Sequence, residues 1–288
     1  MNDAVRQLIG RYRPVSLDDH LRALREVLQE LALLGLWRSR FFEHAAFYGG
    51  TALRVLHGLN RFSEDLDFSL LIPRSDFQIG RFTTALETEI RVFGFDVTVQ
   101  AKSRTRAGAI QSAFLKGDTL GQLVSIDTPA SLTRAVPRGQ TIKIRIEIDT
   151  NPPPAFETEV LYLLAPIPFP VRVYALPDLF AGKMHALLCR QWKARVKGRD
   201  WYDLVWFCGH YPDLHLAHLE ARLAQSGHWP QGQRLTAEDL RRMLDDTIER
   251  VNLEQARAEV EPFVADPAAL RAWSRPFFKD LGRRIIPV

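Results

Sequence analysis

Apolar residues near the start of the chain recur at helical spacing. Leucines follow Ser16 at intervals of three or four positions and continue through Leu31, which predicts one long amphipathic helix. Ser16 and Asp19 have the spacing of the two partners in a capping box, so the helix should begin directly after Ser16.

A strand and a second helix are expected next, on either side of a glycine pair. Residues 45–48 are short and apolar, which favours a buried strand that ends at the pair 49–50. Thr51 is placed to cap the helix that follows, and Gly58 is placed to end it after about residue 57.

The chain up to residue 150 continues mainly with short apolar runs that predict strands. One helix is expected among them, at residues 82–92. This order of elements predicts an α+β core domain over residues 1–150, built on a mixed sheet. The strands are expected at residues 66–71, 95–99, 110–115, 123–126 and 142–148.

The second half of the chain has a different pattern. Prolines interrupt residues 151–176, which we interpret as a proline-rich connection. Residues 177–288 are predicted to form a mostly helical domain that contributes to the active site. Its helices are expected at residues 178–192, 200–208, 216–224 and 236–251.

Composition supports a folded protein and only weakly indicates a partner. The 288 residues are 46% hydrophobic and 25% charged, which allows a conventional core and argues against extensive disorder. The net charge of +4 slightly favours an anionic partner. Basic residues gather in two segments, which contain Lys102, Arg104 and Arg106, and Lys193, Arg195, Lys197 and Arg199.

Cysteine use and hydropathy suggest a cytoplasmic protein. Cys189 and Cys208 are the only cysteines, and no Cys/His ligand pattern accompanies them, so a disulfide framework and a structural zinc site are not expected. The N-terminus lacks the apolar region of a secretory signal. No apolar run approaches the roughly 20 residues that span a bilayer. We therefore expect a soluble cytoplasmic protein with no membrane association.

Two alternating carboxylates follow the second predicted helix. Asp65 and Asp67 would project from the same face of a strand, while Leu66 and Phe68 pack inward. Carboxylates that converge on one point need a cation between them, and ligands that offer only oxygen suit Mg²⁺ or Mn²⁺. The pattern is also compatible with an exposed strand whose acids face water.

The glycine pair suggests a phosphate-binding turn. Gly49 and Gly50 allow the backbone to approach a ligand closely, and the N-terminus of the following helix presents free N–H groups to an anion. Thr51 would add a hydroxyl, and Arg54 a charged contact. An ordinary strand-to-helix turn would show the same residues. The pattern is neither a P-loop nor a dinucleotide fingerprint.

A two-metal site usually needs a third carboxylate from another strand. Residues 142–149 alternate between isoleucine and charged side chains, and Glu147 and Asp149 share the charged face. Glu147 is the first candidate for the third ligand, and Asp149 remains an alternative. A half-exposed surface strand would have the same alternation.

The segments Gly-Gly-Thr-Ala-Leu-Arg at 49–54 and Arg-Phe-Ser-Glu-Asp-Leu-Asp-Phe at 61–68 resemble the signature of the AbiEii/AbiGii-type nucleotidyltransferase toxins. That family includes the MenT toxins and belongs to the DNA polymerase β-like nucleotidyltransferase superfamily. Here a threonine follows the glycine pair. The resemblance implies a polymerase β-like nucleotidyltransferase fold. It is closest over 47–71, recurs near 142–149 and 178–205, and is not traceable over 1–40 and 210–288.

The third matching block implies further site residues. The resemblance assigns Lys183 to the triphosphate and gives a functional role to an aspartate of the following Arg-Asp-x-Tyr-Asp-Leu segment, with Asp200 as the first candidate and Asp203 as the second. Ser63 is placed with the nucleotide-binding residues. Without the resemblance, an ion pair between Arg199 and Asp203 on an ordinary helix is an equally simple interpretation.

The resemblance implies an enzyme that uses Mg²⁺ or Mn²⁺ to transfer a nucleotide from an NTP, as co-substrate, to an acceptor hydroxyl. It further implies a toxin with a separately encoded cognate antitoxin and, as for several relatives, a tRNA 3′ end as acceptor, whose modification blocks translation. The alternatives are transfer to a protein, including the antitoxin or the enzyme itself, and a non-catalytic nucleotide- or RNA-binding protein on the same fold. A purely structural interaction module would leave the clustered acids and glycines unexplained.

Overall fold

A computed structural model describes residues 3–102, 109–190 and 196–288 of the chain. Its contacts divide the chain into two compact units. The first unit contains Met1–Ala52, Glu64–Pro152 and Val160–Val173, and the second contains Leu53–Ser63, Pro153–Glu159 and Tyr174–Val288. This division differs from the expected boundaries, because a segment before the two acids belongs to the second unit and part of the expected connection belongs to the first.

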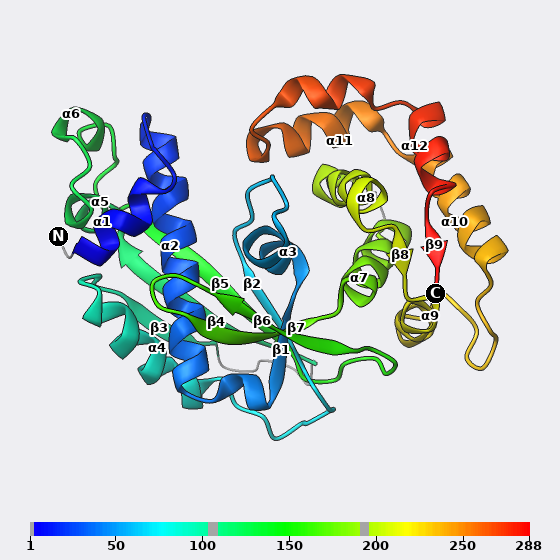
Figure 1. The fold of residues 1–288 in the computed structure, drawn as a ribbon, viewed down its shortest axis with the longest axis horizontal. Coiled ribbons are helices and arrows are strands. Elements are labelled where there is room, and N and C mark those ends of the chain that lie inside the picture. Colours follow the sequence, from blue (N-terminus) through cyan, green and yellow to red (C-terminus); the bar gives the residue numbers. More distant parts are fainter. Residues whose placement is uncertain (1–2, 103–108, 191–195) are drawn as a thin grey trace. The chain divides into compact units, whose positions relative to one another are not determined.

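The first unit is built on a seven-stranded mixed sheet with the strand order β3-β4-β5-β2-β1-β7-β6 (Figure 1). β2 runs parallel to β5 and antiparallel to β1, so the central strands mix both directions. The predicted α+β class with a mixed sheet is confirmed. The strands are β1 (Ala45–Tyr48), β2 (Leu66–Leu70), β3 (Thr98–Ala101), β4 (Ile110–Asp118), β5 (Thr141–Asp149), β6 (Thr158–Leu163) and β7 (Phe169–Tyr174).

Helices and a short 3₁₀ turn cover this sheet. The long helix α2 has the expected capping box at Ser16, and it packs against α4 as it crosses the sheet (Figure 1). The elements are α1 (Asp3–Gly10), α2 (Leu17–Arg38), η1 (Phe41–Glu43), α4 (Gly80–Val92), α5 (Thr119–Ser125) and α6 (Ala130–Thr133). Helix α3 (Gly49–His57) begins in the first unit, and its residues from Leu53 onward belong to the second.

An aromatic cluster fixes the strands that carry the site. The rings of Phe47 and Phe68 stack with centroids 5.1 Å apart, and Phe41 meets Phe68 edge-to-face at 5.0 Å. All three side chains are fully buried, as is Leu66. Burial of Leu66 and Phe68 leaves Asp67, which lies between them, on the opposite face of β2.

Several local predictions were wrong. Residues 123–126, expected as a strand, belong to the end of α5 and the residue after it, because Asp118 caps this helix by accepting a hydrogen bond from the backbone N–H of Gly121. The expected strand at 95–99 is displaced to β3. The proline-rich segment 151–176 is not only a connection, since it contains β6 and β7.

The second unit is mostly helical, as expected for this part of the chain. The backbone of α8 lies so close to α11 that a Cβ atom on Gly198 would be 1.8 Å from the carbonyl oxygen of Ala256. Glycine is therefore required at the start of α8. The elements are α7 (Leu176–Cys189), α8 (Gly198–His210), β8 (Asp213–Leu214), α9 (Leu216–Gln225), α10 (Ala237–Arg250), α11 (Leu253–Val260), η2 (Glu261–Phe263), η3 (Pro267–Ala272), α12 (Arg275–Gly282) and β9 (Ile286–Pro287).

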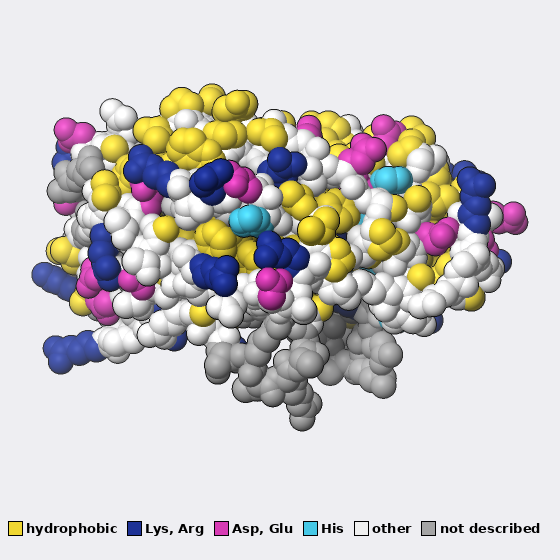
Figure 2. Space-filling model, turned by 90° about the horizontal axis from the view of Figure 1, so that it is seen from below, with side chains coloured by type: hydrophobic (Ala, Val, Ile, Leu, Met, Phe, Trp, Pro, Cys, Tyr) yellow, Lys and Arg dark blue, Asp and Glu magenta, His cyan; other side chains and the backbone are white. Residues whose placement is uncertain are grey.

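Charged side chains are dispersed on one face of the molecule (Figure 2). Figure 2 shows one face, on which Lys and Arg side chains are scattered among acidic and apolar side chains and do not gather in one basic surface. In the parts of the chain that the structure describes, no helix combines the length and the apolar character needed to cross a membrane.

Candidate active site

Carboxylates from two neighbouring strands share one face of the sheet in the first unit. β2 pairs in parallel with β5, and Asp67 lies directly opposite Glu147 in this register. Asp149 lies opposite Ser69, two residues further along both strands. Asp65 comes directly before β2 and continues the same alternation. Of the two candidates for the third acid, Glu147 is therefore the direct neighbour of Asp67.

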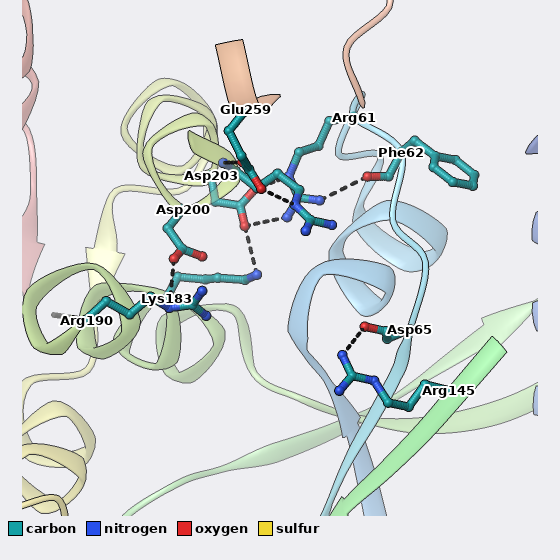
Figure 3. Close-up of polar contacts among 10 residues, drawn as sticks. Arg61, Phe62, Asp65, Arg145, Lys183, Arg190, Asp200, Asp203 and Glu259 are labelled. Carbon is teal, nitrogen blue, oxygen red and sulfur yellow. Dashed lines mark hydrogen bonds and ion pairs between the residues drawn. The ribbon is translucent and has the colours of Figure 1, made fainter. Parts of the chain in front are cut away.

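Arg145 forms ion pairs with two of these acids. Its Nη2 atom lies 2.8 Å from Oδ2 of Asp65 (Figure 3), and its Nη1 atom lies 3.2 Å from Oε1 of Glu147. The hydrogen bond to Asp65 raises the pKa of Arg145 above its ordinary value, with the nearby carboxylate charges adding to this and partial burial opposing it. Sequence reasoning gave Arg145 no role, although its place two residues before Glu147 on the same strand face was a usable signal.

The glycine turn is in direct contact with Asp67. Gly49 has a φ of +85°, in the left-handed region that glycine adopts readily. A Cβ atom at this position would lie 2.6 Å from Oδ2 of Asp67. Only a residue without a side chain lets the carboxylate lie this close to the backbone, so the two halves of the sequence motif meet at this contact.

Thr51 has a different local role from the predicted one. Helix α3 begins at Gly49, so Thr51 lies inside the first turn and is not the N-cap. Its buried hydroxyl donates a hydrogen bond to the backbone carbonyl of Asp65. Because a hydroxyl has one proton to donate, this bond uses it to fix the chain that carries the acids.

The other candidate nucleotide-binding residues near the turn are partly or fully buried. Gly50 and Ser63 are buried, and Arg54 is half-buried. The guanidinium of Arg54 donates a hydrogen bond of 3.2 Å to the backbone carbonyl of Leu59. By their contacts, Arg54 and Ser63 belong to the second unit. Their contact with a nucleotide stays a prediction.

A buried ion cluster forms the second group of candidate residues, within the second unit. Arg61 donates two hydrogen bonds to Asp203, with Nε 2.6 Å from Oδ1 and Nη2 2.7 Å from Oδ2 (Figure 3). The ammonium of Lys183, on α7, lies 2.8 Å from Oδ2 of the same carboxylate. Asp203 is fully buried, and burial alone would raise its pKa. The charges of Arg61 and Lys183 outweigh burial and hold the pKa of Asp203 below its ordinary value.

Asp200 has a separate environment one helical turn away. Its carboxylate lies 3.2 Å from Nε of Arg190, the residue that follows the end of α7 (Figure 3). Burial raises the pKa of Asp200, although Arg190 and Lys183 oppose this. The structure therefore brings Asp203 and not Asp200 to Lys183, which favours the second of the two candidate aspartates for a role beside the lysine.

The basic segment that follows α7 is described only in part. Lys193 and Arg195 lie outside the described residues, as do the last two positions of the helix expected at 178–192. The alternative interpretation paired Arg199 with Asp203, but Arg199 pairs with Glu259 at 3.5 Å, and Asp203 pairs with Arg61 and Lys183. Arg199 also lies over the ring of Phe263, 4.2 Å from its centroid.

Sequence reasoning quoted Arg61 only as the first residue of a motif and assigned it no function. Its partner Asp203 is 142 residues away in the chain. The backbone around Arg61 is held as well, since Arg61 forms an antiparallel bridge with Val264 and the N–H of Phe62 donates to the carbonyl of Phe263 at 2.7 Å. An arginine inside an otherwise apolar and acidic motif was the available signal.

The acids of the first unit have the chemistry of a Mg²⁺ site. Asp65, Asp67 and Glu147 offer only oxygen atoms, which Mg²⁺ and Mn²⁺ prefer. Arg145 shows that Asp65 and Glu147 accept a cation between them. Within residues 3–102, 109–190 and 196–288, no group of three or more His, Cys, Asp or Glu side chains has the geometry to hold a metal ion. Among the described residues, these acids therefore offer oxygen donors of the right chemistry but not a metal-binding geometry, and Asp65 and Glu147 share the guanidinium of Arg145.

Comparison with solved structures identifies the class of fold. The chain is similar to a crystal structure of a Helicobacter pylori protein described as a nucleotidyltransferase, with a TM-score of 0.52, 18% identity, and coverage of 91% of this chain and 92% of that one. It is also similar to JHP933 from Helicobacter pylori, with a TM-score of 0.51, 18% identity, and coverage of 91% and 90%. The chain therefore shares its fold with these two proteins.

A family comparison identifies the group within this class. The family model for the nucleotidyl transferase AbiEii toxin of type IV toxin–antitoxin systems matches residues 31–276. The chain therefore belongs to the AbiEii family, which confirms the resemblance found in its sequence. Membership implies an NTP substrate and an antitoxin partner. No match was found among the curated proteins.

Proposed function

We propose that this protein transfers nucleotides from an NTP to the 3′ end of tRNA in a Mg²⁺-dependent reaction that blocks translation. The observation that carries the proposal is the contact between Gly49 and Asp67. It joins a turn whose following helix can bind phosphate to a carboxylate that can hold a divalent cation.

In this reaction the 3′-hydroxyl oxygen of the acceptor attacks the α-phosphorus of the NTP. A new P–O bond forms, the bond from the α-phosphorus to the oxygen that bridges to the β-phosphorus breaks, and pyrophosphate leaves. The hydroxyl proton passes to one of the acids or to solvent. Bound Mg²⁺ would neutralise charge on the α-phosphate and on the leaving pyrophosphate.

The residues of the first unit hold the cation and the triphosphate. Asp65, Asp67 and Glu147 would supply its oxygen ligands, with Asp149 further along the same face. The first N–H groups of α3 lack partners within the helix, so they are available to phosphate oxygens at the turn. Arg145 balances the charge of the acids before the cation binds.

The buried cluster of the second unit carries an excess of positive charge, which suits the predicted contact of Lys183 with phosphate oxygens. One carboxylate, Asp203, faces the two cations Arg61 and Lys183, so the three side chains keep a net positive charge. Asp200 pairs with Arg190, so its carboxylate charge is balanced within its own ion pair. Lys183 retains some exposure, with 16% of its side chain accessible, and can reach a phosphate oxygen while Asp203 holds its position.

Labelling with each of the four α-³²P NTPs, Mg²⁺ and total tRNA tests the proposal. We expect the wild-type protein to label tRNA with at least one NTP. Asp67→Ala should lose this activity while its circular dichroism and unfolding midpoint remain those of the wild type. Label on a protein instead of tRNA would show that the acceptor is a protein. The absence of label with all four NTPs would overturn the proposal.

A further inference from the structure

Three arginines line a cavity of about 790 Å³ in the second unit. The cavity lies where α10 ends, where α11 begins and where η3 leads into α12. The arginines are Arg250, Arg257 and Arg275, and none of the candidate catalytic residues lines the cavity.

Two of these arginines have no acidic partner in the described part of the chain. Nε of Arg250 donates to the backbone carbonyl of Asp246 at 3.0 Å, and Nε of Arg257 donates to that of Leu253 at 3.4 Å. A carbonyl within the same helix orients a guanidinium but does not neutralise it. Arg250 is exposed and Arg257 is half-buried, so both guanidinium charges are accessible to an anion that enters the cavity.

The remaining charges at the cavity do not cancel this excess. Arg275 pairs with Glu249 at 3.4 Å, and Glu249 also accepts a 2.6 Å contact from Lys279. Glu254 is the acidic side chain among the described residues that line the cavity. The lining thus keeps an excess of positive charge after these ion pairs are counted.

The helix ends at the cavity add to this excess. α11 and α12 both begin there, and each is eight residues long. Asn252 and Ser274 cap these helices by accepting hydrogen bonds from the N–H groups of Gln255 and Phe277. In α11 the N–H groups of Leu253 and Glu254 have no partner within the helix, whereas Pro276 brings no N–H group to the first turn of α12.

The lining also indicates which part of a nucleic acid fits. Trp273, the aromatic residue at this cavity, is 4% exposed and therefore offers no face on which a base could stack. Charges without a stacking surface recognise phosphate and not a base, which is typical of contacts that position a nucleic acid without reading its sequence.

We propose that this cavity binds backbone phosphates of the RNA acceptor and holds the acceptor while its 3′ end is modified. This proposal rests on the proposed function for the identity of the acceptor. It adds a second anion site, distinct in its residues from the one that grips the NTP.

Two double variants, each of which replaces two arginines with glutamine, test the proposed phosphate site. Arg250→Gln with Arg257→Gln removes the two uncompensated charges, and Arg234→Gln with Arg241→Gln removes two exposed arginines of the same unit that do not line the cavity. Both pairs change the net charge equally. Binding of total tRNA is measured by filter retention across a range of salt concentrations, together with the KM values for tRNA and NTP.

For the cavity pair we expect tRNA affinity to fall about 10-fold and the salt slope of log K against log salt to decrease by about 1.4–1.8, since each lost phosphate contact removes about 0.7–0.9. The KM for NTP should not change, and the control pair should behave as the wild type. Equal effects in both pairs, or an effect on the KM for NTP instead of tRNA, would overturn the phosphate site.

The outcomes also separate the two proposals. If the wild type transfers nucleotides to tRNA and the cavity pair binds tRNA normally, the cavity proposal fails and the proposed function stands. If the wild type binds tRNA through the cavity but modifies no RNA, the proposed function fails and the cavity proposal stands. A wild type that neither binds nor modifies tRNA contradicts both.

Discussion

Gly49→Ala is expected to separate the geometry of the site from the stability of the fold. The substitution adds one methyl group at the point where the turn meets Asp67. A Cβ atom there would lie 2.6 Å from the carboxylate oxygen, whereas ordinary contact begins at 3.4 Å, so the two groups must move apart by 0.8 Å. Asp67 is the side chain that can yield, because the backbone of β1 and α3 is held by the sheet and the helix.

Two effects set the expected magnitudes, namely the backbone strain of a side chain at this φ angle and the displacement of the Asp67 carboxylate. A φ of +85° costs a residue with a Cβ atom about 1–2 kcal/mol of unfolding free energy. A displacement of about 1 Å at a reacting group costs about 100-fold in rate. We therefore expect Gly49→Ala to lose about 100-fold in kcat/KM for nucleotide transfer and about 1–2 kcal/mol in stability, measured by labelled NTP incorporation and by urea unfolding.

Gly58→Ala is the matched control at the other end of α3. Gly58 has a φ of +78°, and a Cβ atom there meets nothing within 4 Å. This variant should lose the same stability and keep its transfer rate. If Gly49→Ala is as active as Gly58→Ala, the contact with Asp67 is not needed for catalysis and the reasoning is refuted.

The remaining predictions concern the charged groups. Asp203→Asn should cost about 3–5 kcal/mol at pH 7 in urea unfolding, because it leaves Arg61 buried without a counter-charge. Since the folded pKa of Asp203 is lowered, its stabilising effect is complete above the ordinary value of 3.8 and is lost as the pH falls through the folded value. Asp200→Asn should leave stability at pH 7 unchanged or higher, since burial raises the pKa of Asp200 and makes its ionised form costly; a large loss would contradict this. Lys183→Ala should raise the KM for NTP about 10-fold or more, and an unchanged KM would remove its phosphate role. Arg145→Gln should tighten Mn²⁺ binding about two- to five-fold in calorimetry, as expected for loss of a partly exposed competing cation; weaker binding would count against the metal assignment.

Elements with strong local signals could be predicted from the sequence. The cap at Ser16 and the strand β1 follow from neighbouring residues, and both were predicted at their observed positions. Residues 123–126 were not, because a short run with three apolar residues is compatible with either a helix or a strand. The prolines of 151–176 concealed β6 and β7. Proline weakens a strand prediction, but β6 contains none and Pro170 lies near the start of β7.

The candidate site was predictable where its residues are close in sequence. Asp65, Asp67 and the glycine turn belong to one motif, and the side chains alternate as that motif requires. The pairing of Asp67 with Glu147 depends on which strands become neighbours, and the alternation along β5 alone did not separate Glu147 from Asp149. The pairing of Arg61 with Asp203 depends on the packing of the second unit and has no local signature.

The long interval between Arg61 and Asp203 has a consequence during synthesis of the protein. A ribosome that adds 5–20 residues per second needs roughly 7–28 s to make the 142 residues that separate them. Through that time the arginine has no counter-ion, and the segment that contains it has no partner unit to join. The nascent toxin therefore completes its lysine-bearing cluster only late in translation, so that ribosomes still making the toxin carry an incomplete enzyme.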